Sequence, residues 1–399
     1  MSIYPVKGIK LGSTAAGIRY KDRDDLVVMQ CLPGTTAAGV FTRNRFCAAP
    51  VHVAKQHLSQ TTPRALVINA GNANAGTGEQ GMADALSSCE ALANRLDVST
   101  ETVLPFSTGV IGERLAMDVL TKGLDNCIES ATDSADAWQR AALAIMTTDT
   151  VPKLVSSQVL LGGKTVTVTG IAKGAGMIRP DMATMLAFIA TDATIDSSLL
   201  QAALDAAVNA SFNRITVDGD TSTNDACMLL ATGASGIAPL GMGSNDYELF
   251  VHALNEVMQS LAKSIIRDAE GATKFITINV AGGSSEQDCL AVAYTVAESP
   301  LVKTAMFASD PNWGRILAAV GRARVAALDI QSVSISINDV AVITNGEPDP
   351  GYTEAAGQEA VAPQDIDLSI AIGSGEASTT VWTSDLSHEY VTINAEYRT

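Results

Sequence analysis

The stretch that most constrains the fold of this chain lies near its middle, at residues 173–190. Its first half carries two glycines and a proline, a combination typical of a loop with unusual backbone angles. Its second half, residues 184–190, is a short apolar run with β-branched and aromatic side chains, which predicts a buried strand. A strained loop therefore leads directly into the core, and Ala183 and Thr184 stand where the loop becomes the strand.

A hydroxyl at the first residue of such a strand suits one particular chemistry. If the bond between Ala183 and Thr184 is cut, Thr184 gains a free α-amine, which titrates near pH ~8. That amine can serve as the base for the hydroxyl of the same residue. The small Ala183 leaves room for the hydroxyl to attack the preceding carbonyl, so the cut can be self-catalysed through an N-to-O acyl shift. The alternative is that Thr184 is a strand threonine selected for packing.

Residues 173–186 read KGAGMIRPDMATML and resemble the cleavage and nucleophile motif of the ArgJ family. These proteins are ornithine acetyltransferases, also called glutamate N-acetyltransferases, of arginine biosynthesis. The resemblance covers nearly the whole chain. It implies an α/β fold of the DmpA/ArgJ type, in which stacked β-sheets are flanked by helices and self-cleavage exposes an N-terminal nucleophile. It also implies an alpha chain of residues 1–183 and a beta chain of residues 184–399, assembled as a heterotetramer of two of each.

Composition excludes several other functions. The chain has 399 residues, of which 47% are hydrophobic, and 32 glycines, as expected for a large α/β core with small side chains at tight contacts. Its net charge of −17 argues against nucleic acid and anionic membranes as partners. No apolar run is long enough to span a bilayer, and residues 1–13 have no apolar signal core. We therefore expect small-molecule substrates.

The cysteines and histidines give no sign of a metal or redox site. The six cysteines are scattered without a CxxC pair, so we expect them to be reduced and buried in a cytoplasmic protein. The four histidines are dispersed, which argues against zinc, and we expect no metal and no tightly bound cofactor. No phosphate-binding glycine loop is evident, so the sequence leaves open whether acetyl-CoA is a co-substrate.

A second segment carries a candidate oxyanion hole. Residues 103–112 read VLPFSTGVIG. A small hydroxyl followed by glycine lets an O–H and a backbone N–H converge on one oxygen, as an oxyanion hole requires. From the residues alone a simple turn is the alternative, but the resemblance implies that Thr108 and Gly109 form the oxyanion pair.

The resemblance also implies a set of substrate-binding residues. Lys173 is a cation beside the candidate nucleophile and suits either of two roles, to hold a substrate carboxylate or to lower the pKa of the Thr184 α-amine; a solvated loop lysine is the alternative. Glu270 follows a predicted helix, where the helix dipole disfavours a carboxylate, so a cationic partner such as a substrate α-amine is expected. The alternative is a surface glutamate paired with Lys274. The full set implied by the resemblance is Thr150, Lys173, Thr184, Glu270, Asn394 and Thr399, the last two in a tail over the active site; a frayed terminus is the alternative there.

The polar residues 212–225 are too patterned for a linker. Asp218, Asp220 and Asp225 lie within this run but lack the glycine and distal glutamate spacing of an EF-hand. We expect them to pack near the site through hydrogen bonds rather than to bind calcium.

Apolar spacing predicts the remaining elements. Helices are predicted at residues 80–96, 116–131, 135–147 and 246–268, and strands at residues 26–32, 65–69, 275–280, 333–337 and 368–372. A hairpin is predicted at residues 157–169, around Gly162 and Gly163.

Taken together, these features predict an acetyltransferase that moves the acetyl group from N2-acetyl-L-ornithine to L-glutamate through an acetyl-Thr184 intermediate. Transfer from acetyl-CoA to glutamate is a further activity that the sequence leaves open. Two alternatives remain. One is an N-terminal-nucleophile aminopeptidase or amidase of the same fold, in which water takes the acyl group. The other is a non-enzymatic binding protein in which the bond between Ala183 and Thr184 stays intact.

Overall fold

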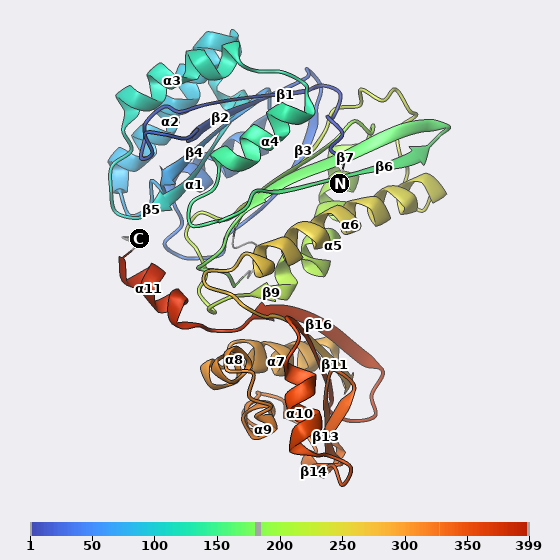
Figure 1. Cartoon of the computed structure of the whole chain (residues 1–399). Helices are drawn as coiled ribbons and strands as arrows, with labels where there is room; N and C mark the ends of the chain where they lie inside the picture. Colours follow the sequence, from blue (N-terminus) through green and yellow to red (C-terminus); the bar gives the residue numbers. More distant parts are fainter. Residues whose placement is uncertain (1, 180–184, 327, 397–399) are drawn as a thin grey trace. The chain divides into compact units, whose positions relative to one another are not determined.

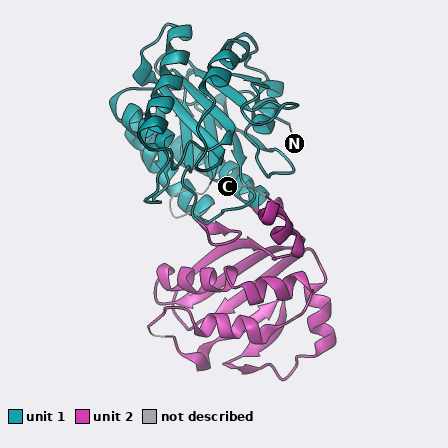
Figure 2. Cartoon of the chain, turned by 90° about the vertical axis from the view of Figure 1, so that its left-hand side faces the viewer, with its two compact units in different colours: residues 1–213, 221–265, 398–399 teal, residues 214–220, 266–397 magenta. Residues whose placement is uncertain are grey.

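The computed structural model describes residues 2–179, 185–326 and 328–396. Ala183, Thr184 and Thr399 lie outside the described residues. The chain divides into two compact units (Figure 2). Unit 1 consists of Met1–Asn213, Thr221–Ile265 and Arg398–Thr399, and unit 2 of Arg214–Asp220 and Ile266–Tyr397. Both predicted chains, residues 1–183 and residues 184–399, therefore contribute to unit 1.

The first sheet of unit 1 has the strand order β1-β2-β4-β5, in which β4 and β5 are parallel and the other neighbours antiparallel. Its two faces enter two different cores because alternate residues of a strand point to opposite sides. Val27 and Met29 face one core, whereas Leu26 and Val28 pack with helices α2 and α3. The strands are β1 (Ile9–Thr14), β2 (Leu26–Cys31), β4 (Ala65–Asn72) and β5 (Val103–Val110); the helices here are α1 (Ala49–Gln60), α2 (Gly78–Leu96), α3 (Met117–Glu129) and α4 (Ala135–Ala144), with a 3-10 turn at Thr100–Thr102.

The second sheet of unit 1 has the order β3-β10-β8-β7-β6. Its central strand, β8, is buried at every residue and pairs in parallel with β10 and antiparallel with β7. The strands are β3 (Thr36–Phe41), β6 (Lys153–Leu161), β7 (Lys164–Lys173), β8 (Leu186–Thr191) and β10 (Ala226–Ala231). Gly162 and Gly163 form the tip of the β6–β7 hairpin with φ of 54° and 75°, values that glycine adopts without strain.

The two sheets of unit 1 stack face to face. Phe106 of β5 and Phe188 of β8 meet edge to face, with ring centroids 5.0 Å apart. On the far side of the second sheet, Gly170 of β7 leaves space for Leu261 of helix α6, because a Cβ there would lie 3.0 Å from the leucine side chain. Helices α5 (Ser197–Ala210) and α6 (Asn245–Arg267) complete a helix–sheet–sheet–helix arrangement (Figure 1). A 3-10 turn at Phe212–Arg214 follows α5.

Unit 2 is built on one sheet with the order β14-β13-β12-β15-β11-β16-β9. Ile276, Ile278 and Val280 of β11 alternate into a core that contains Cys289 and Val292 of α7. The strands are β9 (Ile215–Thr216), β11 (Phe275–Gly283), β12 (Ser334–Ile337), β13 (Val340–Thr344), β14 (Glu347–Pro348), β15 (Asp365–Ala371) and β16 (Ala377–Ser384). The helices are α7 (Glu286–Ala297), α8 (Pro300–Phe307), α9 (Trp313–Gly321), α10 (Glu354–Val361) and α11 (His388–Glu396), with a 3-10 turn at Ile330–Ser332.

Most predicted elements are confirmed within a few residues. The helix predicted at 246–268 is α6, and those at 80–96 and 116–131 are α2 and α3. The helix predicted at 135–147 ends earlier, at Ala144. The alternative of a frayed tail is wrong for residues 388–396, because they form helix α11.

The six cysteines are free; Cys47 is partly exposed and the other five are buried, as predicted. Among the described residues, no helix is both long enough and apolar enough to cross a membrane.

Candidate active site

The segment Ser107-Thr108-Gly109 ends strand β5 at an irregular point of the first sheet. Gly109 has φ of 131°, and a Cβ there would lie 2.2 Å from the carbonyl carbon of Gly71, so only glycine fits. The register of β4 against β5 shifts between Gly71 and Asn72. Such a bulge takes backbone groups out of regular pairing. A backbone N–H and the Thr108 hydroxyl can therefore point at a common oxygen, as an oxyanion hole requires.

Side-chain amides hold this segment in place. The Nδ2 of Asn224, which is buried, donates to the carbonyl oxygen of Ser107 at 2.9 Å and to that of Ala73 at 2.5 Å. The hydroxyl of Ser107 donates to Oδ1 of Asn69 at 2.6 Å. These hydrogen bonds fix the strand that carries Thr108.

The side chain of Lys173, the last residue of β7, reaches Thr108. Its Nζ donates to Oγ1 of Thr108 at 3.2 Å. In the second sheet Leu186 pairs with Lys173 on one side and with Ala226 on the other, and the Ala226 N–H donates to the carbonyl of Met185 at 3.0 Å. The described part of the chain therefore brings Lys173 and Thr108 together beside the strand that follows residue 184.

Asp149, directly before the predicted substrate residue Thr150, is buried beside Lys173. Its carboxylate accepts from Lys153 Nζ at 2.5 Å and from the Gly174 N–H at 2.7 Å. Burial opposes ionisation, but the positive charges of Lys173 and Lys153 and the N–H of Gly174 outweigh it and lower the pKa of Asp149 to about 2. Thr150 itself is exposed, on the loop between α4 and β6.

Asp225 is the second buried carboxyl at this edge of the sheet, one residue before β10. Burial raises its pKa well above the usual range, against the opposing effects of Ser222 and Lys173. Its Oδ2 has no hydrogen-bond partner among the described residues. An ionised carboxylate with an unsatisfied buried oxygen is costly, so the neutral acid is favoured.

The polar run 212–225 packs near predicted site residues in both units, since Asn224 donates to Ser107 and Asp218 accepts from Tyr390 of the helix that carries Asn394. Asn224 and Asp225 lie in unit 1 beside the oxyanion segment, whereas Asp218 and Asp220 belong to unit 2. Within the described ranges, no group of three or more His, Cys, Asp or Glu side chains could hold a metal ion.

In unit 2, Glu270 and Asn394 lie together although 124 positions separate them. Asn394 Nδ2 donates to Glu270 Oε2 at 2.7 Å. Glu270 is 9% exposed. The alternative of a surface pair between Glu270 and Lys274 is wrong, since Lys274 Nζ donates to the carbonyls of Val361, Ala362 and Pro363.

Helix α11, which carries Asn394, is held against the loop at Gly271. The hydroxyl of Ser387 donates to the Gly271 carbonyl at 2.7 Å, and the hydroxyl of Tyr390 donates to Asp218 at 3.2 Å. The pKa of Tyr390 is raised by burial and by the carboxylate of Asp218, so its hydroxyl stays a donor. None of the nine residues of α11 is buried, and the helix is held by these hydrogen bonds and by an edge-to-face contact of His388 with Phe307, whose ring centroids are 5.7 Å apart.

The predicted site residues thus form two groups, Thr108, Gly109 and Lys173 in unit 1 and Glu270 and Asn394 in unit 2. The sequence analysis missed Asp149, Lys153 and Asn224 as supporting residues. Asp149 and Lys153 stand four positions apart in the segment that contains Thr150, which was the available signal.

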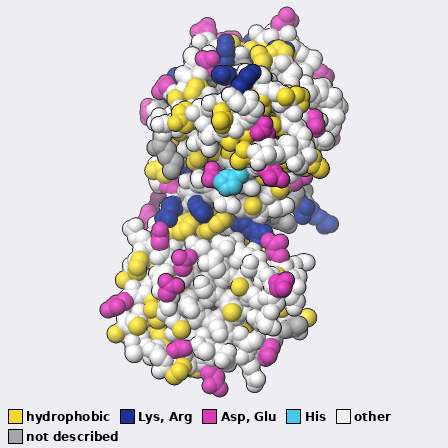
Figure 3. Space-filling model, turned by 90° about the vertical axis from the view of Figure 1, so that its right-hand side faces the viewer, with side chains coloured by type: hydrophobic (Ala, Val, Ile, Leu, Met, Phe, Trp, Pro, Cys, Tyr) yellow, Lys and Arg dark blue, Asp and Glu magenta, His cyan; other side chains and the backbone are white. Residues whose placement is uncertain are grey.

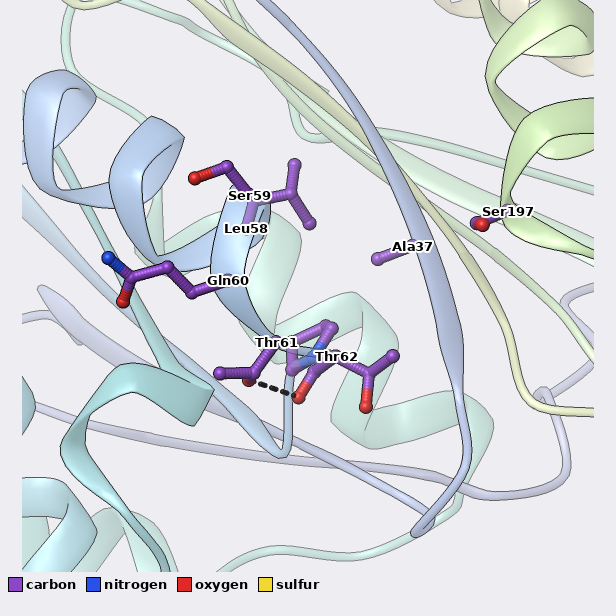
Figure 4. A pocket seen from close by; sticks show the side chains of 8 residues that line it. Ala37, Leu58, Ser59, Gln60, Thr61, Thr62 and Ser197 are labelled. Carbon is purple, nitrogen blue, oxygen red and sulfur yellow. Dashed lines mark hydrogen bonds between the residues drawn. The ribbon is translucent and has the colours of Figure 1, made fainter.

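A cavity elsewhere in unit 1 contains no predicted site residue. It has a volume of about 410 Å³ and lies between the end of α1, β3 and the start of α5 (Figure 4). No ionisable side chain lines it: the lining residues are Ala37, Leu58, Ser59, Gln60, Thr61, Thr62, Pro63 and Ser197. It therefore offers hydroxyl groups but no charged side chain for a substrate carboxylate or amine.

The surface is consistent with the acidic composition. On the face shown in Figure 3, Asp and Glu side chains are spread over the surface, and Lys and Arg side chains occur in small groups between them. This face offers no extended basic patch of the kind that binds nucleic acid.

Two stacked sheets between helix layers, with a hydroxyl–glycine pair at the end of β5, define an α/β protein. The model of the ArgJ family matches residues 10–399, so the chain belongs to the ArgJ family. The family and the fold predicted from the sequence are therefore confirmed.

Relatives match along the full chain. It is 53% identical over 398 residues to the "Arginine biosynthesis bifunctional protein ArgJ" of Psychrobacter arcticus, covering 100% of this chain and 97% of the relative. It is 52% identical to the protein of that name from Pseudomonas syringae pv. tomato, covering 100% and 98%. The crystal structure of the "Arginine biosynthesis bifunctional protein argJ" of Bacillus halodurans is similar with a TM-score of 0.51 and 39% identity, covering 54% of this chain and all of that chain.

Proposed function

We propose that this protein is a glutamate N-acetyltransferase of arginine biosynthesis that moves the acetyl group of N2-acetyl-L-ornithine to L-glutamate. The observation that carries the proposal is the 3.2 Å contact between Lys173 and Thr108 beside the strand that follows Thr184. This contact brings together a cation that can bind a substrate carboxylate, Lys173, and a hydroxyl that can donate to an oxyanion, Thr108. The relatives that match the whole chain are named for arginine biosynthesis, which supports this substrate class.

In the first half-reaction, Thr184 Oγ attacks the acetyl carbonyl while the α-amine of the same residue takes the hydroxyl proton. The Thr108 hydroxyl and the Gly109 N–H stabilise the tetrahedral oxyanion. Collapse of this intermediate breaks the C–N bond, and the departing ornithine nitrogen takes the proton back. In the second half-reaction the α-amine of glutamate attacks the carbonyl of acetyl-Thr184, the C–Oγ bond breaks, and the Thr184 α-amine passes the proton lost by the glutamate nitrogen to Oγ, which restores the hydroxyl.

The substrate backbone is shared by ornithine and glutamate, so one set of residues serves both half-reactions. Lys173 holds the α-carboxylate. Thr150, Glu270, Asn394 and Thr399 complete the contacts to the backbone. The two substrates differ in their distal groups, so the pocket accepts an amine and an acid in turn.

Maturation is part of the same proposal. Self-cleavage between Ala183 and Thr184 gives an alpha chain (1–183) and a beta chain (184–399), which assemble as a heterotetramer of two of each in the cytoplasm. In support, the whole solved chain of the Bacillus halodurans relative is matched by only 54% of this chain, as expected if that polypeptide is divided near the same point.

A denaturing gel tests the cleavage. The wild-type protein is expected to give two bands of about half the full length, and Thr184→Ala a single full-length band. A single wild-type band in active material would contradict the nucleophile.

An acetyl-transfer assay tests the reaction. Purified protein with acetylornithine and glutamate is expected to form acetylglutamate, with no added metal or cofactor. Acetate release that does not depend on glutamate would instead support the aminopeptidase or amidase alternative. The same assay with acetyl-CoA in place of acetylornithine tests the second donor, which we include in the proposal as a co-substrate.

A further inference from the structure

The ion pair between Lys153 and Asp149 is completely buried. Both side chains have 0% exposure, and Nζ and Oδ1 are 2.5 Å apart. A buried ion pair usually contributes little net stability, because removing two charges from water costs about as much as their attraction returns. Its position next to the predicted substrate residues Thr150 and Lys173 suggests a different role.

One carboxylate connects three segments of the site. Asp149 accepts from the N–H of Thr147 at 3.0 Å, from Lys153 Nζ and from the N–H of Gly174. It therefore ties the loop that carries Thr150 to the residue that follows Lys173. Lys153, the first residue of β6, pairs with Ala172 of β7, directly before Lys173.

The charges of Lys173 and of the three ionisable side chains near it sum to one positive charge. Lys153 and Lys173 are cations and Asp149 is an anion, while burial raises the pKa of Asp225 and favours its neutral form. The four side chains together carry one positive charge. Without Lys153, the charge of Asp149 would cancel that of Lys173.

We propose that Asp149 and Lys153 are positioning residues for acetyl transfer: Asp149 fixes Thr150 and Lys173 relative to each other, and Lys153 neutralises Asp149 so that Lys173 attracts a substrate carboxylate undiminished. The inference rests on the proposed function for the identity of the substrates. Its charge balance, however, can be measured without turnover.

The variants Lys153→Met and Asp149→Asn change the local charge in opposite directions. In Lys153→Met the negative charge of Asp149 is no longer neutralised, and it weakens the attraction of Lys173 for a substrate carboxylate. KM for glutamate is therefore expected to rise about tenfold, the effect of one nearby unit charge in a partly buried site. Asp149→Asn keeps an acceptor for the Gly174 N–H and adds one positive charge, so KM is expected to stay level or fall. A merely structural pair predicts that both variants raise KM; that result would overturn the inference.

Chemical labelling of the Lys173 amine provides the readout without turnover. Wild type and variants are treated with acetic anhydride over a range of pH, and the labelled Lys173 peptide is quantified by mass spectrometry. Lys153→Met is expected to lower the labelling rate of Lys173 about tenfold near pH 8, and Asp149→Asn to raise it, because only the neutral amine reacts. Equal rates in all proteins would overturn the inference even if acetyl transfer is observed.

The double variant Asp149→Asn/Lys153→Met keeps the inference testable if one of the single variants does not fold. It removes both charges together and leaves no unpaired buried charge. Its Lys173 labelling rate is expected within about threefold of wild type, because the local charge is unchanged; a tenfold change would contradict the charge balance. If labelling follows these expectations but wild type transfers no acetyl group, only the proposed function fails.

Discussion

The docking of helix α11 at Gly271 gives a sharp prediction for the variant Gly271→Ala. Gly271 has φ of 67°, in the left-handed region that favours glycine. A Cβ there would lie 2.6 Å from Ser387 Oγ and 2.7 Å from the backbone nitrogen of Tyr390. A rotamer change can move the serine hydroxyl but not the backbone nitrogen, so α11 has to shift.

The size of the effect follows from the contacts of α11. Among the described residues, three side-chain hydrogen bonds hold α11 and the residue before it to the rest of unit 2, from Ser387, Tyr390 and Asn394. Each contributes about 0.5–1.5 kcal/mol, which gives about 1.5–4.5 kcal/mol together. The left-handed backbone of an alanine costs about 1 kcal/mol, and the overlap with Tyr390 comes on top. The variant is therefore expected to release α11, and the free energy of unfolding falls by about the contribution of the lost hydrogen bonds, roughly 1.5–4.5 kcal/mol.

Amide hydrogen exchange over residues 388–396 measures the release. In Gly271→Ala these amides are expected to exchange at least about tenfold faster than in wild type. KM for glutamate is expected to rise, because Asn394 leaves Glu270. Gly243→Ala is the matched control: it has φ of 73°, but among the described residues no atom lies within 4 Å of a Cβ there. It carries the same backbone strain and leaves α11 in place.

The reasoning fails if Gly271→Ala protects residues 388–396 as well as wild type does. It also fails if Gly243→Ala exposes them equally, since backbone strain alone would then explain the result.

Three further predictions concern the interior of unit 1. The pKa of Asp225 is raised in the folded state, so the folded protein holds a proton that the unfolded chain loses, and the free energy of unfolding falls as pH rises above about 4. The melting temperature of Asp225→Asn relative to wild type should therefore increase from pH 5 to pH 8. An equal difference at both pH values would refute this prediction. Asp149 behaves oppositely: with a pKa of about 2, its ionisation contributes roughly 2 kcal/mol that is fully present above pH about 4 and lost as pH falls toward 2. In acid titrations of urea unfolding, Asp149→Asn should lack this loss, and a wild-type curve that is flat over that range would count against it. Phe188→Ala removes a ring with 0% exposure that packs edge to face on Phe106, so a loss of about 3–5 kcal/mol is expected in urea unfolding; less than about 1 kcal/mol would show that the stacked sheets do not depend on this contact.

The elements with strong local patterns could be predicted from the sequence. Helix α6 has an apolar face that repeats over its whole length, and β8 is a continuous apolar run bounded by a glycine loop. The Thr108–Gly109 pair was predicted from the family resemblance, because the residues alone are equally typical of a simple turn. The register that places Lys173 opposite Leu186 is long-range, and no local pattern specifies it.

The supporting residues could not be predicted for the same reason. Asn224 acts on Ser107 across 117 positions, and its role exists only once β10 lies beside β8. Lys153 and Asp149 resemble an ordinary exposed pair in the sequence, and only the fold shows that both are buried. Helix α11 has no buried face, so no apolar period marked it.

The second sheet of unit 1 interleaves strands from both sides of the proposed cut. β3, β6 and β7 precede residue 184 in the sequence, whereas β8 and β10 follow it and lie between β3 and β7. Separating the two products would break the ladders of β3 with β10 and of β7 with β8 and would open the core around Phe188. The nicked protein should therefore melt as one cooperative body, and halves produced in separate cells should seldom combine into the native assembly.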